Sequence, residues 1–300
     1  MAPEGQQDTR GQATLRLWYA WPGDLSDAGT EAACAALLND EERARAARFH
    51  FARHRREYLA SHALARNALS HSHPLPPRDW SYSVNAYGKP APIPGSPRAG
   101  LRPWGGFPEC GLSFNQSNSV ELAVCLVASR AATHGAGAGP EVGVDVEAFS
   151  RAEEIVPLAQ KVFSLVEQAQ LNALPAAERP HRALSLWTLK EAYIKARGMG
   201  LSLPLHGISF LFGGVQGIRL EVDAGVDDDP ARWRFCLLEH MQHRIALVVD
   251  AAACCEPKIA ALEMPVLDIF AARPPFAPPT RLPSGRETWF PFLPRRANPT

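Results

Sequence analysis

The stretch VGVDVE at residues 142–147 sets two carboxylates on one face of a short extended segment. Its period-two alternation predicts a β-strand whose three valines face a core, while Asp145 and Glu147 project together from the opposite face. Their backbones lie about 7 Å apart, so the two acids can share a cleft. Hard oxygen ligands of this kind suit Mg²⁺. An Asp-x-Glu pair alone is more often solvated surface, so the interpretation depends on a second element.

That second element is LWTLKEAYIK at residues 186–195, where helical spacing puts Trp187, Glu191 and Lys195 in one stripe at i, i+4 and i+8. Two interpretations are open. In one, Trp187 belongs to the hydrophobic core, and an ion pair between Glu191 and Lys195 stabilises the helix by about 0.3–0.5 kcal/mol. In the other, Glu191 completes a three-carboxylate magnesium site with the two acids of the strand, and Lys195 reaches a phosphate leaving group.

Length and charge bound the class of protein. The chain has 300 residues, enough for two compact units, since domains usually run to about 100–200 residues. It carries 31 Lys plus Arg and 31 Asp plus Glu, so no net field draws it to nucleic acid or an anionic membrane. No stretch has the roughly 18 apolar residues that span a bilayer, and Met1 to Arg16 lacks the apolar core of a signal peptide. We expect a soluble, cytoplasmic protein with reduced cysteines.

Gly and Pro divide the chain into two mixed halves and a tail. We predict an N-terminal unit over 12–133, a C-terminal unit over 142–255 that carries the acids, and a Pro-rich tail over 256–300, with a Gly-rich connector at 131–140. Cap signals and apolar periodicity predict helices at Asn39–Arg53, Tyr58–Leu69, Glu153–Ala173 and Arg182–Arg197. Strands are predicted at Leu112–Asn115, Val120–Ala128, Val142–Val146, Gly207–Phe212, Ile218–Val222, Trp233–Glu239 and Arg244–Val249.

Together these stretches resemble the 4′-phosphopantetheinyl transferases of the surfactin-synthetase-activating type. The family's two signatures, a Gly-x-Asp-x-Glu strand end and a Trp-Ser/Thr-x-Lys-Glu-Ala-x-x-Lys helix, stand here as GVDVE (143–147) and WTLKEAYIK (187–195). The order and the separation of these signatures match those of the family. Further similar stretches are Arg48-Phe49, YGKP at 87–90, FNQS at 114–117, Val162-Phe163-Ser164 with Glu167, and GMGLSLPL at 198–205.

The resemblance implies an α+β (α/β) fold, a pseudo-twofold pair of similar subdomains, each a small, mostly antiparallel sheet packed on a long helix, with coenzyme A between them. It implies a monomeric enzyme that needs Mg²⁺. The enzyme would transfer the 4′-phosphopantetheine arm of coenzyme A to a serine of an apo acyl or peptidyl carrier protein and release 3′,5′-ADP. Carriers of fatty-acid, polyketide and nonribosomal-peptide synthesis all fit.

Site residues follow from the same resemblance. Asp145, Glu147 and Glu191 would hold Mg²⁺ against the pyrophosphate. Lys195 would neutralise or protonate the departing 3′,5′-ADP, and Glu191, or a water on the metal, would take the proton of the carrier serine. The residues expected to grip coenzyme A are Arg45, Arg48, Lys89, Ser117, Asn118 and Lys195.

One position departs from the pattern. Where the family usually has a phosphate-contacting histidine, this chain has Asn118, which can donate a hydrogen bond but cannot carry positive charge. Losing one charge-assisted contact would weaken binding of coenzyme A by about 1.5–3 kcal/mol unless another group replaces it. This change keeps one alternative open, a non-catalytic relative that binds carrier protein or coenzyme A. A second alternative, a metal-dependent phosphohydrolase, rests on the same three acids.

Overall fold

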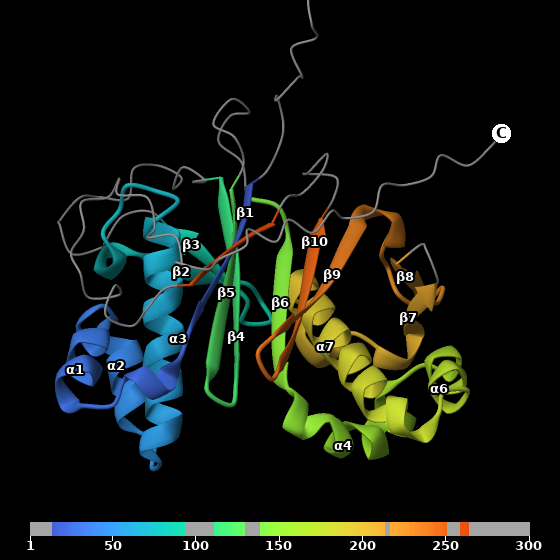
Figure 1. Cartoon of the computed structure of the whole chain (residues 1–300). Coiled ribbons are helices and arrows are strands. Elements are labelled where there is room, and N and C mark those ends of the chain that lie inside the picture. The colour runs from blue at the N-terminus through green and yellow to red at the C-terminus, as the bar shows by residue number, and fades with distance from the viewer. Residues whose placement is uncertain (1–13, 94–110, 130–138, 214–216, 251–258, 264–300) are drawn as a thin grey trace, which may run out of the picture.

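The computed structural model describes residues 14–93, 111–129, 139–213, 217–250 and 259–263. Two sheets lie face to face at the centre, and one long helix covers the outer face of each (Figure 1). These helices are α3 (Ala52–Ser70) and α7 (Arg179–Arg197), each of 19 residues. The layers therefore run helix, sheet, sheet, helix, and the predicted pair of similar α+β halves is confirmed.

The first half contains a sheet with strand order β11-β1-β5-β4. β1 (Thr14–Ala20), β5 (Leu122–Ser129) and β4 (Leu112–Ser119) pair antiparallel, whereas β11 (Ile259–Glu263) joins β1 in parallel. A backbone segment from the predicted tail thus adds a strand to the first half. This half also contains η1 (Pro22–Asp24), α1 (Ala28–Ala36), α2 (Asp40–Ala47), η2 (Pro77–Asp79), and the hairpin of β2 (Ser81–Val84) with β3 (Pro90–Ile93).

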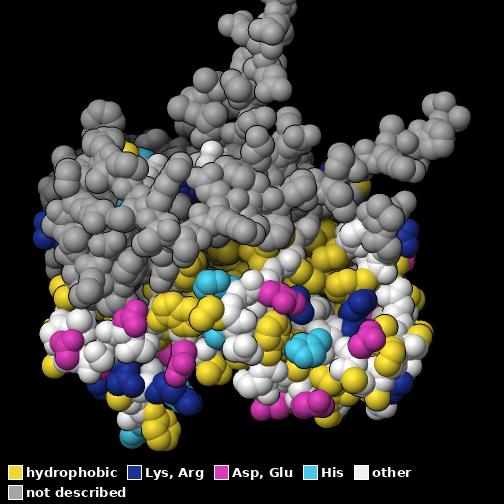
Figure 2. Space-filling view, viewed as in Figure 1, with side chains coloured by type: hydrophobic (Ala, Val, Ile, Leu, Met, Phe, Trp, Pro, Cys, Tyr) yellow, Lys and Arg dark blue, Asp and Glu magenta, His cyan; other side chains and the backbone are white. Residues whose placement is uncertain are grey.

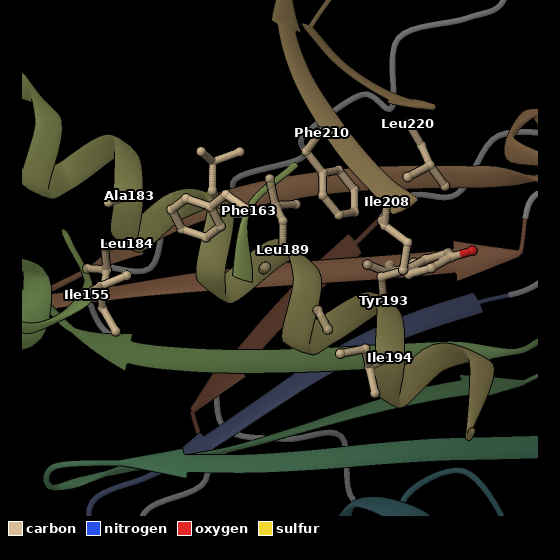
Figure 3. Packing of buried hydrophobic residues seen from close by; sticks show 14 of the residues in the cluster. Ile155, Phe163, Ala183, Leu184, Leu189, Tyr193, Ile194, Ile208, Phe210 and Leu220 are labelled. Atoms are coloured by element: carbon tan, nitrogen blue, oxygen red, sulfur yellow. The ribbon is translucent and has the colours of Figure 1, made fainter. Parts of the chain in front are cut away.

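The second half contains the antiparallel sheet β6-β10-β9, built from β6 (Val142–Ala148), β10 (His243–Asp250) and β9 (Trp233–His240). A separate hairpin joins β7 (Ile208–Gly213) to β8 (Gly217–Val222). The short helices α4 (Ala152–Ile155), α5 (Ala159–Val162) and α6 (Leu165–Asn172) precede α7. Figure 3 shows how Leu189 and Tyr193 of α7 pack against Phe163 and Phe210 in the buried core of this half.

Alternation along the central strands separates three hydrophobic cores. In β5, Cys125 and Val127 face α3, while Val124 and Leu126 face the second sheet. The valines of β6 belong to that same central core, as the period-two pattern predicts. Asp145 and Glu147 on the opposite face are 4% and 7% exposed, so they are not the solvated surface acids that such a pair most often forms.

Side chains join the two sheets where their edge strands β4 and β6 meet. Asn115 Oδ1 accepts a hydrogen bond from the backbone N–H of Val144 at 2.8 Å, and Ser119 Oγ accepts one from Ala148 at 3.2 Å. Buried backbone donors without such partners would cost about 1–3 kcal/mol each. The polar residues of β4 therefore satisfy the edge of β6 and fix the two halves in register.

The predicted helix from Asn39 to Arg53 is wrong in its extent. A capping box starts α2 as predicted, with Glu42 N donating to Asn39 Oδ1 at 2.8 Å and Asn39 N donating to Glu42 Oε2 at 2.9 Å. The helix then ends at Ala47, and α3 begins only at Ala52. This break lets α2 fold back so that Glu42 reaches Arg66 of α3, whereas one straight helix would put those residues about 36 Å apart.

Two other predictions need correction, and two elements were missed. The strand expected from Val120 begins at Leu122, because Val120 and Glu121 form the turn after β4 and Glu121 takes a positive φ of 67°. The helix expected over 153–173 is divided, since Pro157 sits in a 3₁₀ turn and Ser164 caps a new helix with Glu167. β1 and α1 were not predicted. The connector at 131–138 and most of the tail lie outside the described residues.

None of the helices in the described part of the chain combines the length and the apolar character needed to cross a bilayer. On the face seen in Figure 2, basic and acidic side chains are interspersed rather than gathered by sign, in keeping with the balanced composition.

Gly143 sets how closely α7 approaches β6. A Cβ at this position would lie 2.0 Å from Ala192 O and 2.5 Å from Ala196 N, and both atoms are helix backbone that cannot move aside. The glycine of the GVDVE stretch therefore allows backbone-to-backbone packing that no other residue permits. The contact also fixes the height of α7 beside Asp145, two residues further along β6.

We predict that Gly143→Ala lowers the free energy of unfolding by about 1–3 kcal/mol or more, because the added methyl group overpacks a rigid contact. Urea denaturation followed by circular dichroism measures the change. Gly23→Ala is the matched control, since nothing lies within 4 Å of a Cβ built at Gly23. Equal stability of Gly143→Ala and Gly23→Ala would contradict the proposed close approach.

Candidate functional site

A pocket of about 330 Å³ lies between the halves, beside the joined edges of the two sheets. Four elements line it: α3 contributes Tyr58, Ser61 and His62, β4 contributes residues 116–118, β6 contributes residues 145–147, and α7 contributes Lys195. α3 packs on the first sheet and α7 on the second, so they supply opposite walls. Of the predicted site residues, Ser117, Asn118, Asp145, Glu147 and Lys195 meet in this pocket.

Two side chains of the pocket donate to Asp145, and both reach the same carboxylate oxygen. Its Oδ1 accepts hydrogen bonds from Lys195 Nζ at 2.6 Å and from Ser117 Oγ at 2.8 Å. Its Oδ2 is buried and has no hydrogen-bond partner among the described residues. A buried acceptor without a partner is uncommon in folded proteins and marks a place where a further group can bind. Asp145 therefore offers one free oxygen to a cation.

Glu147 is held by three donors. Arg151 NH1 lies 2.6 Å from Oε2, Ser119 Oγ lies 3.1 Å from the same oxygen, and Trp187 Nε1 donates to Oε1 at 3.1 Å. Trp187 is thus more than a core residue, since its indole N–H orients a carboxylate. This network fixes the direction of the carboxylate but leaves it fewer free lone pairs than Asp145 has.

Glu191 lies one residue before the contact of α7 with Gly143. Burial raises the pKa of its carboxyl group, repulsion from Asp145 and Glu147 adds to the rise, and Lys195 partly offsets it. The three acids therefore interact electrostatically. Within the described structure, Lys195 forms its ion pair with Asp145, and no ion pair joins it to Glu191. Among the described side chains, the Glu191–Lys195 ion pair of the first interpretation is therefore not formed.

The pocket's donors suit a hard cation that brings ligands of its own. Among the residues described, no group of three or more His, Cys, Asp and Glu side chains is arranged to hold a metal ion by itself. Mg²⁺ usually binds proteins through one or two carboxylates and completes its shell with water and substrate phosphates. Asp145 has a free Oδ2, and Glu147 and Glu191 lie close enough for their carboxylates to interact electrostatically with each other and with Asp145, so the three acids fit that kind of incomplete site.

Lys190, the other lysine of the helix signature, points away from the pocket. It is 1% exposed, forms a 2.8 Å ion pair with the fully buried Glu167, and donates to Leu205 O at 2.8 Å. Removing one partner of such a pair leaves an unpaired buried charge. Lys190 therefore fixes α7 against α6 and the start of β7, while Lys195 serves the pocket.

Lys89 does not line the pocket. Its ammonium donates to Ala196 O at 2.5 Å and to Val142 O at 3.2 Å, and neighbouring Asn85 donates to Gly198 O at 2.7 Å. Gly198 takes a positive φ of 60° at the end of α7. The β2–β3 hairpin thus ties the first half to the end of α7 and to the start of β6.

Arg45 and Arg48 lie at the end of α2 near Tyr58, and both are exposed. The Arg45 guanidinium lies 5.7 Å from the centre of the Tyr58 ring, and the positive charges of both arginines act on the Tyr58 hydroxyl. Since Tyr58 lines the pocket, these two cations are placed beside its α3 wall.

Sequence reasoning missed the three α3 residues of the pocket, Tyr58, Ser61 and His62. Their spacing of i, i+3 and i+4 puts them on one helix face, a signal that was available. The same stretch also carries the apolar period that buries α3 in the core, and that stronger pattern hid the polar face.

Comparisons with known proteins point to one family. The model of the 4′-phosphopantetheinyl transferase superfamily matches residues 141–248. A 4′-phosphopantetheinyl transferase of Bacillus subtilis is 30% identical over 195 residues, which cover 65% of this chain and 75% of the relative. The 4′-phosphopantetheinyl transferase HetI of a Nostoc species is 32% identical over 168 residues, covering 56% of this chain and 62% of the relative. The matched part thus spans about two thirds of the length of these relatives.

A solved holo-(acyl-carrier-protein) synthase from Bacillus anthracis, in complex with coenzyme A, shares 18% identity over 37% of this chain and 94% of its own, with a TM-score of 0.31.

We predict that Lys89 makes stability depend on pH. Burial lowers the pKa of Lys89 to about 8, whereas an unfolded lysine titrates near about 10.4. Between those values the unfolded state binds more protons, so the free energy of unfolding should rise with pH, by up to about 3 kcal/mol.

The measurement compares urea denaturation of the wild type with that of Lys89→Met between pH 7.5 and about 10. The difference between the two isolates Lys89, because the raised pKa values of the buried cysteines Cys34 and Cys236 act equally in both proteins. Parallel pH profiles for the two proteins would show that Lys89 keeps an ordinary pKa.

Proposed function

This chain belongs to the 4′-phosphopantetheinyl transferase superfamily, and we propose that it moves the phosphopantetheine arm of coenzyme A onto a serine of an apo carrier protein. One observation carries the proposal: Asp145, Ser117 and Lys195 form a hydrogen-bonded cluster in a pocket between the halves, and Asp145 keeps a buried oxygen free. The position of Glu147 in the same pocket supports it.

The proposed reaction forms one bond and breaks one. The serine oxygen of the carrier attacks the phosphorus that bears the pantetheine arm, and the bond from this phosphorus to the 3′,5′-ADP oxygen breaks. The hydroxyl proton of the serine passes to a base, and the negative charge on the leaving oxygen must be neutralised. Such transition states leave little covalent work for the protein, so positioning and charge supply most of the acceleration.

Two residues of α7 are suited to accept the serine proton and to neutralise the charge on the leaving oxygen. Glu191 carries a carboxylate whose pKa is raised by burial, which makes it a better proton acceptor than an ordinary glutamate. Lys195 Nζ lies between Ser117 Oγ, at 2.8 Å, and Asp145, so its charge can turn to a phosphate oxygen. Asp145 and Ser117 hold that ammonium in place before substrate arrives, which reduces the entropy lost on binding.

We also propose that Mg²⁺ binds at Asp145, Glu147 and Glu191, where it would neutralise pyrophosphate charge when bound. The unpartnered Oδ2 of Asp145 supports this. We further propose that the protein is a cytoplasmic monomer that serves carriers of fatty-acid, polyketide or nonribosomal-peptide synthesis. Cys34, Cys125 and Cys236 are free and buried, in keeping with a reducing compartment.

Mass spectrometry tests the proposed activity. Apo carriers of all three kinds are incubated with the protein, Mg²⁺ and coenzyme A, and at least one should gain the mass of the phosphopantetheine arm. No gain on any carrier would favour the non-catalytic relative. Phosphate or nucleotide release without a carrier would favour the phosphohydrolase.

We predict that Asp145→Asn lowers the transfer rate at least about a hundredfold, because it removes one negative charge from the centre of the pocket. The side chain keeps its size and can still hydrogen bond Lys195 through its carbonyl, so circular dichroism should remain as in the wild type. Asp24→Asn is the matched control, since Asp24 is exposed on η1. Equal rates for Asp145→Asn and wild type would remove Asp145 from the mechanism.

A further inference from the structure

The pocket contains few groups able to meet an anion as charged as coenzyme A. Of its lining residues, Lys195 and His62 alone can carry positive charge. Lys195 is already paired with Asp145 at 2.6 Å. Asn118, which lines the same pocket, is uncharged at any pH. His62 is therefore the lining group left to meet a second phosphate.

Glu42 holds His62 in one orientation. Its Oε1 lies 3.1 Å from His62 Nδ1, while its Oε2 accepts from Arg66 at 2.7 and 3.1 Å. Burial alone would raise the pKa of Glu42, but the hydrogen bond from His62 and the charge of Arg66 lower it overall, so Glu42 stays ionised. With Nδ1 engaged by a carboxylate, Nε2 is the nitrogen left for a ligand.

The surroundings of His62 leave Nε2 accessible. The side chain is 24% exposed, and its ring stacks on Tyr58 with 4.0 Å between centroids. No hydrogen-bond partner of Nε2 occurs among the described residues, and the atom is not among the buried unpartnered ones. Arg66 cannot compete for the ligand, because it is fully buried and donates to Glu42 and to the carbonyls of Pro77 and Trp80.

The two walls of the pocket suit different phosphates. The reacting pyrophosphate must lie near Lys195 and the acids of β6, where its bond breaks. The remaining phosphate of coenzyme A, on the 3′ oxygen of its ribose, then lies against the α3 wall. This wall carries His62 and is flanked by Arg45 and Arg48.

We propose that His62, oriented by Glu42, binds the 3′-phosphate of coenzyme A through Nε2 and supplies the positive charge that Asn118 lacks. This inference rests on the proposed function, since it takes coenzyme A as the ligand. Because Nδ1 already donates to Glu42, Nε2 can donate to phosphate only when the imidazole is protonated. Binding of the phosphate should therefore be coupled to uptake of a proton.

The charged groups around His62 are of both signs. Glu42 and Arg66 form its immediate network, Arg45 and Arg48 lie beyond Tyr58, and across the pocket stand Asp145, Glu147 and Lys195. These groups are common to the wild type and to a His62 variant. A comparison of the two therefore isolates the imidazole.

Calorimetric titration with coenzyme A and with dephospho-coenzyme A, which lacks the 3′-phosphate, tests the proposal. His62→Gln keeps an amide that can donate to Glu42, and we expect it to weaken coenzyme A binding about tenfold or more. Its affinity for dephospho-coenzyme A should equal that of the wild type. His54→Gln, on the same helix but outside the pocket, should bind both ligands as the wild type does.

Two further measurements exclude a merely structural role. The ratio of wild-type to His62→Gln affinity should fall as pH rises from about 6 to 8, because Nε2 can donate to phosphate only from the protonated imidazole. The double variant His62→Gln with Asn118→His should regain coenzyme A affinity, because it returns an imidazole to the same pocket.

Equal losses for both ligands, no loss for either, or a double variant no better than His62→Gln would each overturn the proposal. Carrier modification by the wild type is measured separately. If transfer succeeds while His62→Gln binds normally, the inference fails and the proposed function stands.

Discussion

The close packing of α7 on β6 at Gly143 is the constraint on which the pocket depends. Backbone atoms of Ala192 and Ala196 occupy the space that a side chain at Gly143 would need. Each of these alanines directly follows a side chain to which we assign a role, Glu191 or Lys195, so the contact sets the position of both against Asp145. The glycine and the acids of the GVDVE stretch therefore act together. Gly143 lets α7 pack closely on β6, and Asp145 can then contact Lys195 of α7.

A second constraint holds the two halves together across that device. β4 uses Asn115, Ser117 and Ser119 as a row of polar side chains that bind β6, its backbone and its carboxylates. Ser117 serves both purposes, because it joins the halves and orients Asp145 and Lys195. The pocket thus cannot form in either half alone, which agrees with a substrate that lies between the halves of a transferase.

The strand that carries the two acids could be predicted from the sequence, whereas most of the contacts around it could not. Alternation in residues 142–147 was enough to place the valines in a core and the acids together, because strand geometry is local. The contacts made by Glu42 were not predictable in the same way. They depend on a helix break after Ala47 that brings Arg66 and His62 beside Glu42, and capping rules set helix starts better than ends. The hydrogen bond from Lys89 to Ala196 O likewise depends on where α7 ends. The pairing of β11 with β1 joins residues more than 200 positions apart, a long-range contact that no local pattern encodes.

We propose that the pocket between β6 and α7 receives the pyrophosphate of coenzyme A together with a divalent ion. A crystal structure of the complex with coenzyme A and Mn²⁺, with the ion located by its anomalous scattering, tests it most directly. We expect a peak within about 2.0–2.3 Å of Asp145 Oδ2 and of a pyrophosphate oxygen, with Lys195 turned to phosphate. An ion and pyrophosphate bound elsewhere, with the ion pair between Lys195 and Asp145 intact, would contradict it.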